Sequence, residues 1–253
     1  MFNFKEIDTI YLYDGTFNGL LTIVFDCYVE KVVPKNVYIK DSFTPSFIDS
    51  YEYKETDLEK ALRIFDGISS SISYDCLFIN YHAFLSEVKN KEINILKYLL
   101  YGFKVGPKID TMLSLDPILF VQKVKKAVWY ETQRLKGFVR FRQVADEFFY
   151  SEIEPDNDIL ELLGEHFRKR FPNQNLIIND NKRKIVFLYN KKEATIVDSK
   201  NISIPKISEQ EQDYQNLWTG FCKSIAIQER KNSRLQKQYM PKRYWKYMFE
   251  TEN

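Results

Sequence analysis

Several residue types and motifs are scarce in this sequence, and their absence excludes classes of function. There are 2 histidines and 3 cysteines, and the cysteines are widely spaced without a Cys-x-x-Cys pair. No cluster therefore has the spacing of a zinc or iron–sulfur site, and we expect reduced thiols in a cytoplasmic protein. The glycine patterns of a P-loop or a Rossmann fold are missing, as are the nucleophile elbow and the HExxH zinc motif. We predict no metal site and no cofactor.

Long hydrophobic runs are also missing. The apolar run GLLTIVF is far shorter than the roughly 20 residues that a transmembrane helix needs. The opening stretch, MFNFKEIDTIYLYDG, lacks the basic and apolar regions of a signal peptide, so none is expected. Net charge is only +2, so a polyanionic partner has to be bound by a local patch rather than by the field of the whole protein. We expect no membrane partner.

What is present favours a well-packed protein. The chain has 253 residues, of which 44% are hydrophobic and 28% charged, and it contains 20 Phe and 17 Tyr. This length predicts one large domain or two closely packed units.

The spacing of apolar residues predicts an α+β fold. Residues 1–136 read as a mainly helical region, with a strand before Gly15, an apolar helix face from Phe17 capped by Thr16 or Asp14, and a loop over 41–54. At Gly137 the helical period gives way to alternation.

The second half of the chain predicts a sheet followed by helices. Residues 137–205 have the pattern of a mostly antiparallel sheet of about five strands, crossed by one helix at 156–171 that Asp156 can cap. Residues 206–253 return to helical spacing and end in a basic, aromatic tail, and we expect these helices to pack back on the sheet. The three regions are expected to form one integrated unit.

The stretch KGFVRFRQ is a candidate for nucleic-acid contact. A strand would place Phe138, Arg140 and Arg142 on one face, where an aromatic ring can stack on a base and guanidinium groups can bind phosphates. The alternative is an ordinary solvated face, with the two arginines paired to Glu152 or Glu154 on the next strand.

The tail, ERKNSRLQKQYMPKRYWKYM, is the second candidate. Its cations can neutralise phosphates and its aromatic rings can stack on exposed bases. The alternative is the wet face of a terminal helix, with Leu235 and Tyr239 buried. Pro241 should end that helix, so KRYWKYM is expected to form its own turn. The predicted nucleic-acid contacts of both stretches together are Arg140, Arg142, Arg230, Arg234, Lys242, Arg243, Tyr244 and Trp245.

Enzyme chemistry has few candidates. Asp14, Glu154, Asp156 and His166 are the residues that could act as acid or base near a pocket. Each also has a structural explanation, because acids at a helix start are explained by capping and by the helix dipole. A histidine beside an apolar stripe is often a packed core residue. The sequence therefore leaves open whether the protein is an enzyme.

Several blocks resemble one bacterial family. They are YLYDGTFNGLLTIVFDCY, RLKGFVRFRQ, IEPDNDILELLGEHFRKRFPNQNLIINDNKRKIVFLY and LWTGFCKSIAIQERKNSRLQKQYMPKRYWKYM. In this order they resemble a domain of unknown function found in bacterial DNA-metabolism and DNA-repair proteins. Such proteins are commonly encoded beside a radical S-adenosylmethionine protein of DNA modification or repair, and a related domain is fused to uracil-DNA-glycosylase-like domains.

The resemblance implies a role linked to DNA and a radical S-adenosylmethionine protein as partner. The chain itself has neither the CxxxCxxC motif of that partner nor the GxDPY or HPSPL motifs of a glycosylase. We therefore expect an accessory DNA-binding protein of a repair or modification system. The alternatives are an enzyme acting on DNA bases or nucleotides through an acidic and histidine pocket, and a protein-interaction module that docks the radical enzyme without touching DNA.

Overall fold

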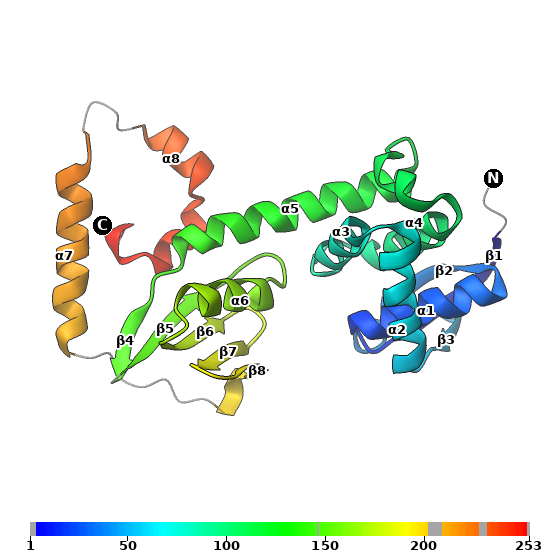
Figure 1. The fold of residues 1–253 in the computed structure, drawn as a ribbon, viewed down its shortest axis with the longest axis horizontal. Coiled ribbons are helices and arrows are strands. Elements are labelled where there is room, and N and C mark those ends of the chain that lie inside the picture. The colour runs from blue at the N-terminus through cyan, green and yellow to red at the C-terminus, as the bar shows by residue number, and fades with distance from the viewer. Residues whose placement is uncertain (1–3, 146, 202–208, 228–231, 252–253) are drawn as a thin grey trace. The chain divides into compact units, whose positions relative to one another are not determined.

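A computed structural model describes residues 4–145, 147–201, 209–227 and 232–251. The chain divides into two compact units, an N-terminal unit, Met1–Trp129, and a C-terminal unit, Tyr130–Asn253 (Figure 1). Each unit combines helices with its own sheet, so the predicted α+β class is confirmed.

A parallel three-stranded sheet opens the N-terminal unit. β1 (Lys5–Tyr13) lies between β2 (Val32–Ile39) and β3 (Ser50–Tyr53). α1 (Phe17–Glu30) connects β1 to β2, since parallel neighbours need a crossover rather than a tight turn. The prediction of a loop over residues 41–54 is wrong for β3, which pairs with β1. That pairing lies far away in the sequence, so local composition gave no signal for it.

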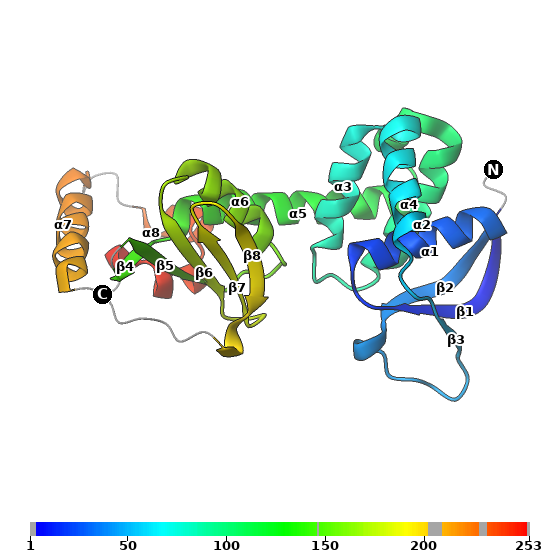
Figure 2. The same ribbon diagram turned by 60° about the horizontal axis from the view of Figure 1, so that its bottom comes forward.

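Helices pack against one face of this sheet, where α1 and α4 are seen above the strands in Figure 2. The oxygen Oγ1 of Thr16 accepts a hydrogen bond from the amide of Gly19 at 3.0 Å, so Thr16 caps α1, one of the two caps predicted. Tyr13, Leu20 and Leu96 are fully buried in the common core. The helices after the sheet are α2 (Leu58–Gly67), α3 (Tyr74–Phe84), α4 (Lys91–Val105) and α5 (Asp116–Phe138).

The C-terminal unit has the predicted five-stranded sheet. Its strands are β4 (Arg142–Ala145), β5 (Phe148–Ile153), β6 (Asn175–Asp180), β7 (Ile185–Asn190) and β8 (Ala194–Asp198), in the order β4-β5-β6-β7-β8. Three pairings are antiparallel, and β5 pairs with β6 in parallel because α6 (Leu160–Arg170) crosses between them. A Cβ on Gly164 would lie 2.3 Å from the ring of Phe187, so glycine allows α6 to approach β7 closely.

The strand predicted at KGFVRFRQ is wrong in its first half. Gly137 and Phe138 belong to α5, and β4 begins only at Arg142. The amide of Val139 still donates to the carbonyl of Leu135 at 3.0 Å. Because Glu131, Leu135 and Val139 are all buried at steps of four residues, the helical period continues past the glycine.

The described part of the C-terminal region contains α7 (Glu209–Ile225), α8 (Ser233–Tyr239) and two short 3₁₀ turns, Lys242–Tyr247 and Phe249–Thr251. α7 has apolar residues at helical spacing, as expected for this region, but Leu217, Phe221 and Ile225 among them are exposed. Leu235 and Tyr239 of α8 are exposed as well, contrary to the burial considered for them. Within the described part of the chain, no helix is long and apolar enough to cross a membrane.

Candidate nucleic-acid interface

The basic, aromatic end of the chain folds back onto the C-terminal unit. Here the C-terminal segment means residues 241–251. Pro241 follows the last residue of α8 and its cap, as predicted, and the two 3₁₀ turns come after it. Tyr244 and Met248 are each only 2% exposed. The segment is therefore packed against the unit and is no free tail.

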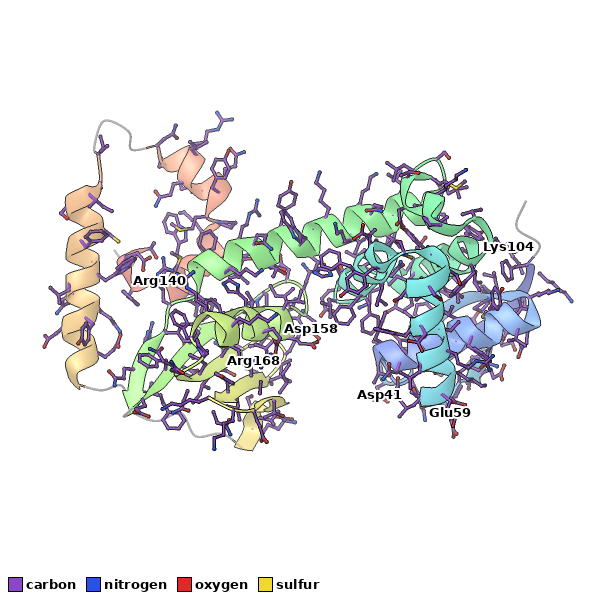
Figure 3. The ribbon with its side chains drawn as sticks, viewed as in Figure 1. Asp41, Glu59, Lys104, Arg140, Asp158 and Arg168 are labelled. Atoms are coloured by element: carbon purple, nitrogen blue, oxygen red, sulfur yellow. The ribbon has the colours of Figure 1, made fainter. Side chains whose placement is uncertain are left out.

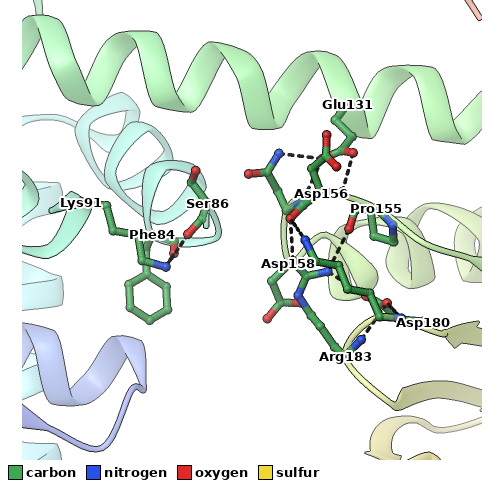
Figure 4. A network of polar contacts seen from close by, with 11 residues as sticks. Phe84, Ser86, Lys91, Glu131, Pro155, Asp156, Asp158, Asp180 and Arg183 are labelled. Carbon is green, nitrogen blue, oxygen red and sulfur yellow. Dashed lines mark hydrogen bonds and ion pairs between the residues drawn. The ribbon is translucent and has the colours of Figure 1, made fainter. Parts of the chain in front are cut away.

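Glu131, near the end of α5, is the main anchor of this segment. Its carboxylate accepts hydrogen bonds from the hydroxyl of Tyr244 (2.7 Å) and from the backbone amides of Asp156 (2.7 Å) and Asn157 (3.0 Å). The side-chain amide of Asn157 donates a further bond at 2.6 Å. Figure 4 shows Glu131 above the loop that carries Pro155 and Asp156. One buried carboxylate thus joins α5, the β5–α6 loop and the C-terminal segment.

The side chain of Tyr244 is held inside the protein by its hydrogen bond to Glu131. Burial raises the pKa of its hydroxyl, and the hydrogen bond to Glu131 raises it further. Its ring lies 6.0 Å from that of Phe138, centroid to centroid, inside the packing. Tyr244 therefore offers no free ring face to a nucleic-acid base.

Arg140 is also occupied by protein groups. It follows the end of α5 (Figure 3), and its Nε and Nη2 donate to one carboxylate oxygen of Glu250 at 2.8 and 2.5 Å. Its Nη1 donates to the carbonyl of Gly137 at 2.7 Å, and its guanidinium lies over the ring of Trp218 at 5.8 Å. The arginine fastens the C-terminal segment and is poorly placed to bind phosphate.

Arg142 differs from Arg140. It begins β4 opposite Tyr150, and its guanidinium has no hydrogen-bond or ion-pair partner among the described residues. The alternative pairing with Glu152 or Glu154 is not found, since Glu152 accepts from the hydroxyl of Tyr150 at 2.9 Å. Glu154 is bonded elsewhere. Arg142 is half-buried and retains donors for an external anion.

A pocket of about 450 Å³ lies beside the C-terminal segment. Four cationic side chains and two carboxylates surround it, so positive charge is in excess. We call it the basic pocket. It is lined by Glu154, Pro155, Asp156, Lys182, Lys242, Arg243 and Lys246.

Most charged groups of the basic pocket already have partners. Nη1 of Arg243 lies 2.6 Å from a carboxylate oxygen of Asp156, and Lys246 pairs closely with Glu154. Nζ of Lys182 donates to the backbone carbonyl of Asp156 at 2.7 Å. Lys242 is exposed, and its ammonium lies 5.9 Å from the ring centroid of Trp245. It has no carboxylate partner among the described residues. Lys242 is thus the cation best placed to receive an anion.

Three predicted contact residues remain, namely Trp245, Arg234 and Arg230. The indole nitrogen of Trp245 donates to the carbonyl of Met240 at 2.9 Å, and the ring is half-buried. Arg234 is exposed on α8. Arg230 lies outside the described residues.

Glu154 and Asp156, two of the proposed acid–base residues, line the basic pocket. Hydrogen bonds from Lys246 first and Tyr247 second hold the pKa of Glu154 below its ordinary value. A carboxylate stabilised in its charged form is a poor proton donor at neutral pH. The prediction that Asp156 caps the helix is wrong, because the N-cap of α6 is Ile159. Asp156 instead uses its carboxylate on Arg243.

His166 and Asp14 do not join this pocket. Burial first, and then the charges of Lys136 and Arg170, lower the pKa of His166, whose ring packs edge-on against Phe167. Asp14 belongs to the N-terminal unit. Burial alone would raise its pKa, but hydrogen bonds from Thr16 and Thr56 outweigh burial and hold the pKa below its usual value. Asp14 thus organises the start of α1.

Metal binding finds no support in the described part of the chain. No group of three or more histidine, cysteine or acidic side chains there could hold a metal ion. The carboxylates that gather at Arg183 have partners of their own: Nη1 of Arg183 lies 3.0 Å from Asp180, and its Nε lies 4.0 Å from Asp158 (Figure 4).

Two important residues were missed by sequence reasoning. Glu131 had one usable signal, since a charged residue occupies a step of the buried α5 stripe and must find partners there. Lys182 lies in the turn between β6 and β7, and its sequence context gave no indication of a pocket.

Comparison with known proteins gives one clear match. A family model described as a domain of unknown function (DUF4130) matches residues 89–250, which is more than half of the chain. No curated protein matches the sequence significantly. Among solved structures, a pGpG-specific phosphodiesterase, PggH from Vibrio cholerae, aligns with a TM-score of 0.35 and 9% identity, covering 86% of this chain and 98% of its own. That TM-score is too low to indicate a shared fold or activity.

Proposed function

The chain belongs to the DUF4130 family, whose function is unknown, and from its site we propose that it is a nucleic-acid-binding accessory protein of DNA repair or modification. The excess of cations around the basic pocket is the observation that carries this proposal. Side chains of this type bind the phosphate backbone, which dominates affinity for nucleic acid.

The proposed contact surface differs from the one expected from sequence. Lys242 and Arg243 are kept, with Lys182 and Lys246 added because they line the same pocket. Arg142 is kept as a separate contact outside that pocket. Arg140 and Tyr244 are left out, since both are bound within the protein. No described aromatic ring lines the pocket, so phosphates rather than bases are the groups recognised there.

Salt-dependent binding tests the proposal. Fluorescence anisotropy with labelled single-stranded and duplex DNA, repeated at several salt concentrations, should give affinity that falls as salt rises. Arg142→Ala and Lys242→Ala should each weaken binding and reduce the logarithmic salt slope by about 0.7 to 0.9, the share of one phosphate contact. Lys192→Ala, at an exposed turn away from the pocket, is the matched control. Binding without salt dependence, or slopes unchanged in both variants, would refute the proposal.

The finer part of the proposal is a partnership with a radical S-adenosylmethionine protein. Resemblance to DNA-repair proteins encoded beside such an enzyme supports it. Co-purification of the two proteins, with and without DNA, tests it directly. A complex that forms only with DNA would mean that the nucleic acid bridges the proteins, and absence of any complex would remove the partnership.

A second candidate function is protein docking, favoured by the exposed apolar stripe on α7. Exposed apolar residues that cluster on one helix face are typical of interaction sites. In this alternative the stripe docks the radical enzyme without DNA contact. Leu217→Glu with Phe221→Glu should then abolish co-purification, while Gln212→Glu on the same helix should not. Loss of DNA affinity in the first variant would instead assign α7 to the nucleic-acid surface.

A further inference from the structure

The composition of the basic pocket carries an inference about which phosphate it takes. Its cations exceed its carboxylates by two. A phosphodiester in a DNA backbone carries one negative charge, whereas a terminal phosphate monoester carries about −1.5 to −2 at pH 7. We propose that the basic pocket binds the phosphate monoester at the end of a DNA strand. This inference rests on the proposed function.

The size and lining of the pocket fit a strand end. A volume of about 450 Å³ lies within the usual range of small-ligand sites, so a terminal phosphate enters together with its sugar. Pro155 is the one uncharged residue in the lining, and there is no ring on which a base could stack. The pocket therefore recognises charge and not base identity.

The existing ion pairs provide the discrimination between the two kinds of phosphate. Arg243 is held by Asp156, and Lys246 by Glu154, so an incoming anion competes with both carboxylates. A dianion attracts both cations more strongly than a monoanion does, because Coulomb energy scales with charge. Lys242 receives the phosphate first, since it has no carboxylate partner among the described residues.

Matched oligonucleotides test the inference. Short strands of one sequence, with a 5′-phosphate, a 3′-phosphate or hydroxyl ends, are compared by competition anisotropy at one salt concentration. A phosphorylated end should bind about tenfold more tightly, the effect of one added charge-assisted hydrogen bond. Lys242→Met with Lys246→Met should remove this preference, while Lys192→Met should retain it.

A second readout uses pH. The second pKa of a phosphate monoester is about 6. The groups that face it are lysine, arginine and carboxylate side chains, types that do not ordinarily titrate between about pH 5.5 and 8. The preference for a phosphorylated end should therefore shrink as pH falls from 8 to 5.5, since the monoester loses a charge while a diester does not.

The outcomes separate this inference from the proposed function. Equal affinity for phosphorylated and hydroxyl ends, with salt-dependent binding of both, overturns the inference and leaves the proposed function in place. A preference that survives the double lysine substitution also overturns it. If DNA does not bind at all, the proposed function falls, and NMR titration with methyl phosphate against dimethyl phosphate decides on the pocket. Equal effects of the two small probes on the pocket residues then overturn the inference.

Discussion

At the scale of single residues, buried polar groups of the C-terminal unit form hydrogen bonds with one another. Glu131 is 5% exposed and would be costly to bury alone, but four hydrogen bonds compensate its lost hydration. The same bonds place the β5–α6 loop and Tyr244, and therefore the pocket residues Asp156 and Arg243 beside them. Glu131 thus fixes the position of two residues that line the basic pocket.

Glu131→Ala should destabilise the C-terminal unit by about 2 to 3 kcal/mol, because the hydroxyl of Tyr244 is left buried without an acceptor and the loop amides lose theirs. Urea denaturation followed by circular dichroism measures the loss. Glu193→Ala, on an exposed turn, should change stability by less than about 0.5 kcal/mol. Equal stability of the two variants would contradict the anchoring role of Glu131.

The Glu154 carboxyl should titrate below the ordinary value of 4.5 in the folded protein, because Lys246 and Tyr247 stabilise its charged form. A folded-state pKa that is depressed contributes stability above the unfolded value, and this contribution is lost as pH falls through the folded value. Solvent screening keeps the contribution small. NMR titration of the side-chain carbon should show the pKa returning toward 4.5 in Lys246→Met. An identical titration in both proteins would show that the ion pair does not form in solution.

At the scale of elements, the C-terminal segment is held in place by side-chain contacts at several points. Tyr244 is bound to Glu131, Glu250 to Arg140, and the hydroxyl of Tyr247 donates to Glu154 at 2.8 Å. Two turns of 3₁₀ helix have few hydrogen bonds of their own, so these side-chain contacts fix their position. The segment carries Lys242, Arg243 and Lys246, so the basic pocket forms only when the C-terminal segment is held in place.

Arg140→Met should loosen this segment. Glu250 would lose its guanidinium partner, and its side chain is only 10% exposed. Under native conditions, trypsin should cleave faster after Lys242 and Lys246, by about tenfold for each 1.4 kcal/mol of local stability lost. Mass spectrometry of the products measures the rate. Arg168→Met breaks an exposed pair with Glu165 on α6 and is the matched control. Unchanged cleavage in Arg140→Met would mean that the other contacts suffice.

The whole molecule consists of two units with separate cores. Tyr13, Leu99 and their neighbours form the core of the N-terminal unit. In the C-terminal unit Leu163 of α6 is fully buried, and Gly164 of the same helix lies against Phe187 of the sheet. α5 continues from one unit into the other, since it runs from Asp116 to Phe138 while the units divide after Trp129. The basic pocket and Arg142 all belong to the C-terminal unit.

Separate cores predict separate responses to cavity-forming substitutions. Leu99→Ala and Leu163→Ala each remove a fully buried side chain and should each cost about 3 kcal/mol. In differential scanning calorimetry, we expect each substitution to lower the melting temperature of its own unit's transition. A single transition lowered equally by both variants would mean that the two units unfold as one.

Much of the local structure follows from the sequence alone. Thr16 caps α1, Pro241 follows the end of α8, and the alternation after β4 marks the strands of the second sheet, because caps, proline and residue period act over a few neighbours. The cationic and aromatic character of the chain end is likewise evident from the amino-acid sequence.

Tertiary structure alone decided which of these residues remain available. Arg140 and Arg142 are two positions apart and chemically alike, yet Arg140 is bound to Glu250, more than a hundred positions along the chain, and Arg142 is not. Tyr244 became a buried donor because Glu131 lies opposite it, and Lys182 entered the basic pocket from a turn on the sheet. Such partners are brought together by folding across long separations. The local sequence pattern therefore cannot distinguish Arg140, which is bound to Glu250, from Arg142, whose side chain has no hydrogen-bond or ion-pair partner among the described residues.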